Sequence, residues 1–141
     1  MTYAARRPAG YAARSYIDIG LETQVMSASP ERLVTLLFSG ARAAIAQARL
    51  HLEAGRVAER GMAISKATRI VDEGLKTGLN MEAGGDIAVN LANLYDYIVR
   101  TLLLANLKGD AAHLDTADRL LAELAQAWQT SNDPSAGTVP A

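Results

Sequence analysis

The chain has 141 residues, with 14 basic and 15 acidic side chains, a formal net charge of −1 and no cysteine. This length suits a single domain, and without cysteine there are no disulfides, thiolate zinc sites or cysteine nucleophiles. The balanced charge provides no bulk field that would attract nucleic acid or anionic lipid. Charged residues interrupt each apolar stretch before the ~18 residues of a membrane span, and the N-terminus lacks the apolar segment of a secretory signal. We expect a cytoplasmic protein that binds no nucleic acid and does not insert into a membrane.

The N-terminal residues 1–28 differ in composition from the rest of the chain. They contain several arginines, and tyrosines that include Tyr11 and Tyr16, with only short apolar spacing. We predict a mobile N-terminal arm, in which a short extra helix could form. At the other end, residues 131–141 are small and polar and are predicted to be disordered.

Between these ends, residues 29–130 carry four helical patterns with no proline after Pro30. The first begins at Ser29, a capping residue, and runs to Gly55. The second runs from Val57 to Asn80 and is separated from the third by Gly84-Gly85. The third spans Asp86 to Lys108, and Gly109-Asp110 ends it and caps the fourth. Long helices with short connections predict an all-α fold, an antiparallel up-down four-helix bundle.

Each pattern has one apolar face that is predicted to enter the core. The predicted core residues are Leu33, Leu37, Ala41, Ala44, Ala48 and Leu52, then Ile64, Ala67, Val71 and Leu75, then Ile87, Leu91, Leu94, Ile98, Leu102 and Ala105, and finally Leu114, Ala117, Leu121, Leu124 and Trp128. On the third helix, Tyr95 lies close to the core face and is predicted to point inward, whereas Tyr97 is predicted to be more exposed.

The residues that could carry chemistry are few. A di-metal site in a helical bundle needs repeated Glu-x-x-His pairs, and neither His51 nor His113 belongs to such a pair. No glycine-rich phosphate loop occurs, because Gly84-Gly85 lacks the required lysine and glycine spacing. We therefore predict no cofactor, no metal and no enzymatic activity.

The third helix has more apolar surface than one core face requires. A second stripe lies opposite the predicted core face and consists of Val89, Ala92, Val99, Leu103 and Leu107. The first helix has a lesser stripe that falls away from its main face and consists of Leu36, Ala43 and Leu50. Either the arm covers this stripe or the third helix is more enclosed than assumed; alternatively, the stripe is a groove for an amphipathic helix of a partner. An arm that covers the groove would bring Tyr11 and Tyr16 to the same place.

Several of these segments, in this order, resemble the family of flagellar secretion chaperones, FliS. They are Ala28-Ser29-Pro30, Leu37-Phe38-Ser39-Gly40-Ala41, Gly84-Gly85-Asp86-Ile87, Leu94-Tyr95-Asp96-Tyr97-Ile98 and the closing helix up to Trp128. The resemblance implies a non-enzymatic helical bundle that binds the disordered C-terminal segment of flagellin in the cytosol. It also implies that the complex prevents premature filament assembly and is presented to the type III export gate. A monomer that forms a 1:1 complex fits this interpretation.

An alternative from another class is a helical scaffold or homodimerisation module, with the second stripe as the dimer seam. Light scattering on the purified chain separates the two readings, because a concentration-independent monomer leaves the stripe for a different partner.

Overall fold

A computed structural model describes residues 28–132. Within them lie four helices: α3 (Pro30–Glu53), α4 (Val57–Arg69), α5 (Met81–Lys108) and α6 (Ala111–Ser131), with the π-helical segment η2 (Ile70–Lys76) directly continuing α4. This part of the chain is 89% helical and contains no strand, which confirms the predicted all-α bundle. Tyr11, Tyr16 and the rest of the predicted arm lie outside the described residues, except Ala28, and so does the tail from residue 133.

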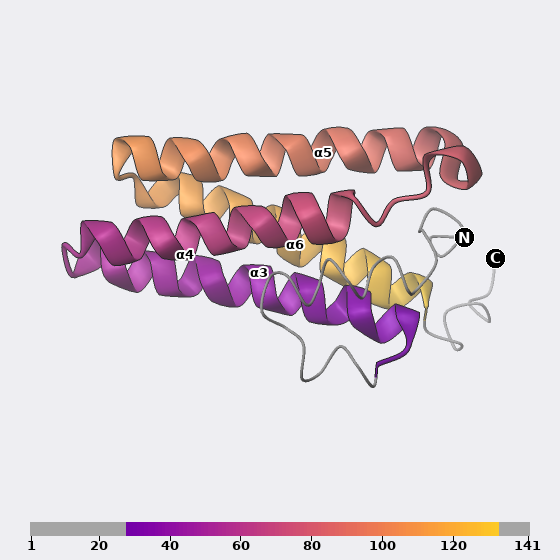
Figure 1. Cartoon of the computed structure of the whole chain (residues 1–141), viewed down its shortest axis with the longest axis horizontal. Helices are drawn as coiled ribbons and strands as arrows, with labels where there is room; N and C mark the ends of the chain where they lie inside the picture. Colours follow the sequence, from indigo (N-terminus) through magenta and orange to yellow (C-terminus); the bar gives the residue numbers. More distant parts are fainter. Residues whose placement is uncertain (1–27, 133–141) are drawn as a thin grey trace.

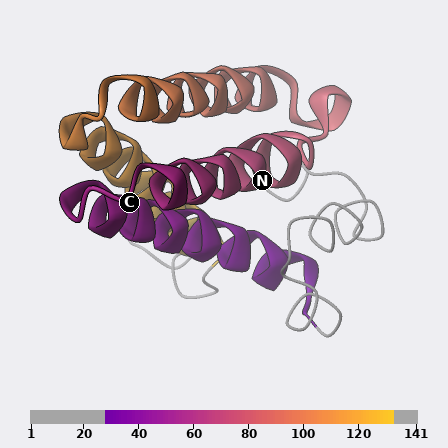
Figure 2. The ribbon, with the colours of Figure 1, turned by 60° about the vertical axis from the view of Figure 1, so that its left-hand side comes forward.

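Each helix runs antiparallel to the next (Figure 1). α4 lies between α3 and α5, and α6 packs against both α3 and α5 on the other side of the bundle (Figures 1 and 2). α3 and α5 therefore occupy diagonal positions. On one side of the molecule, α4 and η2 therefore lie between α3 and α5.

The predicted helix caps are present. The Ser29 hydroxyl accepts a hydrogen bond from the Arg32 amide at 3.2 Å, and the Asp110 carboxylate accepts one from the Ala112 amide at 2.9 Å. Gly109 ends α5 with φ +60°, a left-handed conformation that favours glycine. These caps satisfy amide groups that have no partner within their own helix.

Two predicted boundaries are wrong. The second helix ends at Lys76 rather than Asn80, because the Asn80 side chain accepts a hydrogen bond from the Ala83 amide at 3.0 Å and caps the next helix instead. α5 thus begins at Met81, before the glycine pair that was expected to separate two helices. Gly85 has φ +54° and ψ −133°, so it kinks α5 rather than ending it.

The core contains the predicted faces of α3, α4 with η2, and α6, with Leu52 and Leu124 only partly buried. For α5 the prediction was wrong at Ile87, which is 51% exposed while Ala88 beside it is buried; Leu91 and Leu94 are partly buried and pack against the core. Apolar residues surround most of this helix, so periodicity alone does not fix which face turns inward. The expectation for the two tyrosines is confirmed: Tyr95 is 3% exposed and Tyr97 46%.

Candidate functional site

Exposed apolar side chains concentrate on α5. Of the ten large hydrophobic side chains that the described residues expose, seven belong to this helix. α5 is also the one described helix that is long and apolar enough, by length and composition, to cross a membrane, although Asp96 and Arg100 interrupt it. A core helix of a bundle passes the same test, and here only a third of its most apolar window is buried. The surplus apolar surface faces outward.

The α5 stripe, which we define as Val89, Ala92, Val99, Leu103 and Leu107, provides much of this surface. Val89, Leu103 and Leu107 are 44%, 54% and 80% exposed, whereas Ala92 and Val99 are partly buried and pack against the core. The stripe is therefore attached to the core at its middle and open to solvent toward both ends of the helix. Exposed apolar side chains that gather on one face of a helix are typical of a binding surface.

Polar contacts show which neighbour the stripe faces. Asn106, one turn after Leu103, accepts hydrogen bonds from the Arg60 guanidinium through its side-chain and backbone oxygens, at 3.1 and 3.0 Å. Asp96, which lies within the stripe, accepts a hydrogen bond from Lys76 Nζ at 2.7 Å. Arg60 is on α4 and Lys76 on η2, so the stripe follows the side of α5 that faces these two segments.

A groove of about 670 Å³ opens between α4 and α5 beside the C-terminal half of the stripe. The groove, which we call the α4–α5 groove, is lined by Ala58, Gly61, Met62, Ser65, Lys66, Arg69 and Asn106. Three of these residues, Ala58, Gly61 and Ser65, are small, and Gly61 leaves the nearest side-chain atoms of Asn106 at 3.8 Å from where a Cβ would stand. Small side chains let the backbone of a docked segment approach closely. Sequence reasoning missed this wall, although the signal was present in the spacing i, i+3, i+7 of small residues along one face.

Beyond the groove, the Lys76–Asp96 ion pair joins η2 to α5. The hydrogen bond to the Asp96 carboxylate raises the pKa of Lys76, and the negative charges of Asp96 and Asp72 act in the same direction, whereas burial lowers it. Both side chains are more than a third exposed, at 36% and 39%, so the pair is a weak tie that a docked segment could displace. Asp96, which interrupts the apolar stripe in the sequence, is thus partnered in the folded chain.

Leu36 is not brought together with the α5 stripe. It is partly buried on α3, and α4 lies between α3 and α5. Its neighbourhood belongs to a second groove, of about 500 Å³, between α3 and α4, where Ala43 and His51 are among the lining residues. Leu36 is therefore a separate candidate contact rather than part of the same surface.

Polar chemistry is sparse in the part of the chain that the structure describes. His113 Nε2 lies 3.8 Å from the Asp110 carboxylate, which already caps α6, and residues 28–132 hold no group of three or more histidine and acidic side chains placed to bind a metal. What these residues assemble is a groove of small, apolar and polar residues beside a helix with exposed apolar side chains. The fold and surface define an all-helical bundle protein with a partly uncovered apolar helix face.

Comparison with known proteins gives the family. The model of the family described as flagellar protein FliS matches residues 12–134. The chain is 49% identical to the flagellar secretion chaperone FliS of Salmonella typhimurium over 82% of this chain and 86% of that protein. It is 39% identical to FliS of Escherichia coli, over 86% and 91%, and 38% identical to FliSB of Pseudomonas aeruginosa, over 83% and 92%. The chain belongs to the FliS family of flagellar secretion chaperones.

Proposed function

We propose that this protein is the export chaperone of flagellin in the cytoplasm. It binds the disordered C-terminal segment of flagellin, prevents premature polymerisation and delivers the cargo to the flagellar type III secretion apparatus. Family membership supports the chaperone role. The observation that carries the binding proposal is the exposure of the α5 stripe along the α4–α5 groove.

The dimensions of this surface suit a helical piece of cargo. From Val89 to Leu107 the stripe extends along about five turns of α5, or roughly 27 Å at 1.5 Å per residue. A cargo segment with apolar residues at i, i+3, i+4 and i+7 would bury its apolar face against the stripe. One such surface per chain gives a 1:1 complex, and no step of this function requires catalysis.

The test is calorimetric titration of the chain with a peptide of the flagellin C-terminal segment. In Leu103→Asp, the new carboxylate would have to lose its water beneath the docked helix, so binding should fall by at least tenfold. Leu50→Asp is the matched comparison, because Leu50 is 58% exposed, much like Leu103 at 54%, but belongs to the lesser stripe of α3, outside the α4–α5 groove. It should bind as the wild type does. Far-ultraviolet circular dichroism checks that both variants are folded, and full binding by a folded Leu103→Asp would contradict the groove assignment.

The predicted arm gives a second comparison with the same peptide. If residues 1–20 cover the groove in the free chaperone, their removal takes away a competitor and the affinity rises several-fold or stays level. If Tyr11 or Tyr16 instead clamps the bound cargo, the affinity of the truncated chain falls.

The second candidate is a homodimerisation module with the α5 stripe as its seam. The exposed leucines of α5 would serve either role. Light scattering over a range of concentrations separates them: a constant monomer mass supports the chaperone, and a dimer whose formation Leu103→Asp abolishes supports the module.

A further inference from the structure

A charged residue lies in the middle of the α5 stripe. Asp96 follows Ala92 by four residues and precedes Val99 by three, so the three side chains lie on one face of α5. On that face Asp96 Oδ1 accepts a hydrogen bond from Lys76 Nζ at 2.7 Å, and both side chains are more than a third exposed. A helical segment that covers the stripe along its length therefore also covers this ion pair.

The ion pair has hydrogen-bonding capacity that the described residues do not use. An ammonium group has three N–H donors, and within residues 28–132 Lys76 directs one of them to Asp96 and none to another residue. A carboxylate has two acceptor oxygens, and Asp96 Oδ2 accepts no hydrogen bond from the same part of the chain. Solvent can satisfy these groups as long as nothing covers them.

An apolar side chain placed over the pair would exclude that solvent and supply no partner. A polar group that is covered without a hydrogen bond costs binding free energy. Displacing Lys76 does not remove the cost, because it leaves the Asp96 carboxylate unpaired beneath the docked segment. A side-chain amide meets both requirements, since its N–H groups donate to the carboxylate and its oxygen accepts from the ammonium.

We propose that the Lys76–Asp96 pair selects the cargo segment and fixes its register. The occupant is an amphipathic helical segment whose apolar face is interrupted by one glutamine. The glutamine lies against Lys76 and Asp96, and the apolar residues on either side of it cover Val89 and Leu103. This inference rests on the proposed chaperone function and adds to it the chemistry of the segment that the α5 stripe accepts, because segments that leave the pair unsatisfied are rejected.

The experiment titrates the full chain with two designed amphipathic peptides that differ at one position. Both have a leucine stripe long enough to cover Val89 to Leu107; the glutamine peptide has glutamine at the centre of the stripe, and the leucine peptide has leucine there. On hydrophobicity alone the leucine peptide would bind more tightly. The wild type should instead bind the glutamine peptide about tenfold more tightly, since the leucine peptide leaves the ion pair unsatisfied.

Replacing the ion pair by apolar side chains should reverse this preference. Lys76→Met combined with Asp96→Leu removes the polar groups, so this variant should bind the leucine peptide more tightly. Arg42→Met combined with Asp118→Leu is the matched control, because it removes an exposed ion pair between α3 and α6 and also leaves the net charge unchanged. The control should keep the preference for glutamine, and circular dichroism checks that both variants are folded.

The register is measured by nuclear magnetic resonance on the complex with the glutamine peptide. With an isotope label in the peptide's glutamine, the side-chain amide protons should show nuclear Overhauser effects to the methylene groups of Lys76. Contacts of this amide with Asn106 instead of Lys76, or equal affinity of the wild type for the two peptides, overturn the proposal.

Leu103→Asp shows which proposal fails. If it abolishes binding of both peptides while the wild type binds them equally, the glutamine rule is wrong and the groove assignment stands. If it binds both peptides as the wild type does, the rule and the groove assignment are both wrong. A preference for glutamine in a chain that does not bind the flagellin peptide supports the rule and overturns flagellin as the cargo.

Discussion

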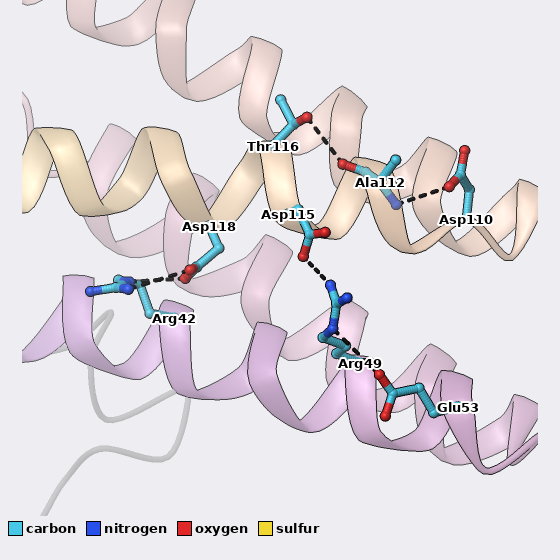
Figure 3. Close-up of polar contacts among 8 residues, drawn as sticks. All are labelled: Arg42, Arg49, Glu53, Asp110, Ala112, Asp115, Thr116 and Asp118. Carbon is cyan, nitrogen blue, oxygen red and sulfur yellow. Dashed lines mark hydrogen bonds and ion pairs between the residues drawn. The ribbon is translucent and has the colours of Figure 1, made fainter.

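The two sides of the bundle are held together differently. On the α3–α6 side, the Arg42 guanidinium forms two hydrogen bonds to the Asp118 carboxylate, at 2.9 and 3.3 Å, and Arg49 pairs with Asp115 one level further along (Figure 3). Trp128 adds a hydrogen bond from its indole nitrogen to the backbone oxygen of Glu31 at 3.3 Å. Long side chains thus connect α3 and α6 at three positions along their length.

On the α4–α5 side, α5 makes polar contacts with α4 through Arg60–Asn106 and with η2 through Lys76–Asp96. Between Asp96 and Asn106 lie about three helical turns of α5. Over this distance α4 presents small residues and α5 presents Leu103, which is 54% exposed. Within residues 28–132, this part of the surface is the open α4–α5 groove.

The difference indicates a division of roles. α3 and α6 form a back wall that is joined by ion pairs, and α4 and α5 form a front that carries nine of the ten exposed large apolar side chains of the described residues. Covering these side chains is the contribution that we assign to cargo. Substitutions on one side can be compared with matched substitutions on the other.

The largest effect is expected for Tyr95→Ala, on the closed face of α5. The ring is 3% exposed and lines a cavity of about 80 Å³ together with Phe38 and Trp128. Removing it enlarges that cavity, so the free energy of unfolding should fall by about 3–5 kcal/mol. Urea denaturation followed by circular dichroism measures this loss.

Tyr97→Ala is its counterpart on the exposed face, two residues along the same helix. Tyr97 is 46% exposed and lies 5.9 Å from the Arg100 guanidinium, measured to the ring centre. Its loss should cost no more than about 1 kcal/mol. Equal losses for the two tyrosines would show that α5 is rotated relative to the structure.

An intermediate effect of opposite sign is expected for two glycine-to-alanine changes on the continuous α4–η2 segment, one facing the core and one facing the groove. At Gly74 a Cβ would stand 2.9 Å from Leu37 Cδ2, and Leu37 is fully buried, so Gly74→Ala should destabilise the chain by about 1–3 kcal/mol. At Gly61 the nearest atom is 3.8 Å away, so Gly61→Ala should stabilise α4 by about 0.5–1 kcal/mol.

Gly61→Ala also tests the α4–α5 groove. The added methyl group narrows the wall against which a docked segment would pack. We expect a more stable protein that binds the flagellin peptide several-fold more weakly, measured by thermal denaturation and calorimetry on the same sample. A gain in stability with unchanged binding would remove Gly61 from the contact surface.

Much of the fold was accessible from the sequence. The apolar spacing on α3, α4 and α6 identified the faces that are buried, and Ser29, Gly109 and Asp110 marked real helix ends. The start of α5 was not predicted, because the side chain of Asn80 decides it and the glycine pair is the more conspicuous signal. Local signals were sufficient wherever a helix had one apolar face.

Only part of the candidate site could be predicted from the sequence. The α5 stripe is visible as a surplus of apolar residues at helical spacing, but its neighbour depends on how α5 is rotated in the bundle. That rotation is set by contacts such as Arg60–Asn106, which join positions 46 residues apart. The small residues of α4 can be recognised as one wall of a groove only when α5 is known to lie beside them.

The smallest effects are expected for the ion pairs, which can be compared by double-mutant cycles. Alanine substitutions of Arg42 and Asp118 on the back wall, and of Lys76 and Asp96 on the front, should each give a coupling of about 0.2–1 kcal/mol, since all four side chains are exposed by a third or more.

The two ion pairs should respond differently to alkaline pH. Because the pKa of Lys76 is raised above the ordinary 10.5, its pair stabilises the fold fully below that pH and loses this contribution as the pH rises through the raised value. The hydrogen bond to Asp118 raises the pKa of Arg42, whose guanidinium already holds its proton more tightly than a lysine does, so that pair should keep its coupling at the alkaline pH where the Lys76 pair loses its own. Equal loss of both couplings at that pH would show that the two sides respond to a general loosening of the bundle rather than to the titration of Lys76.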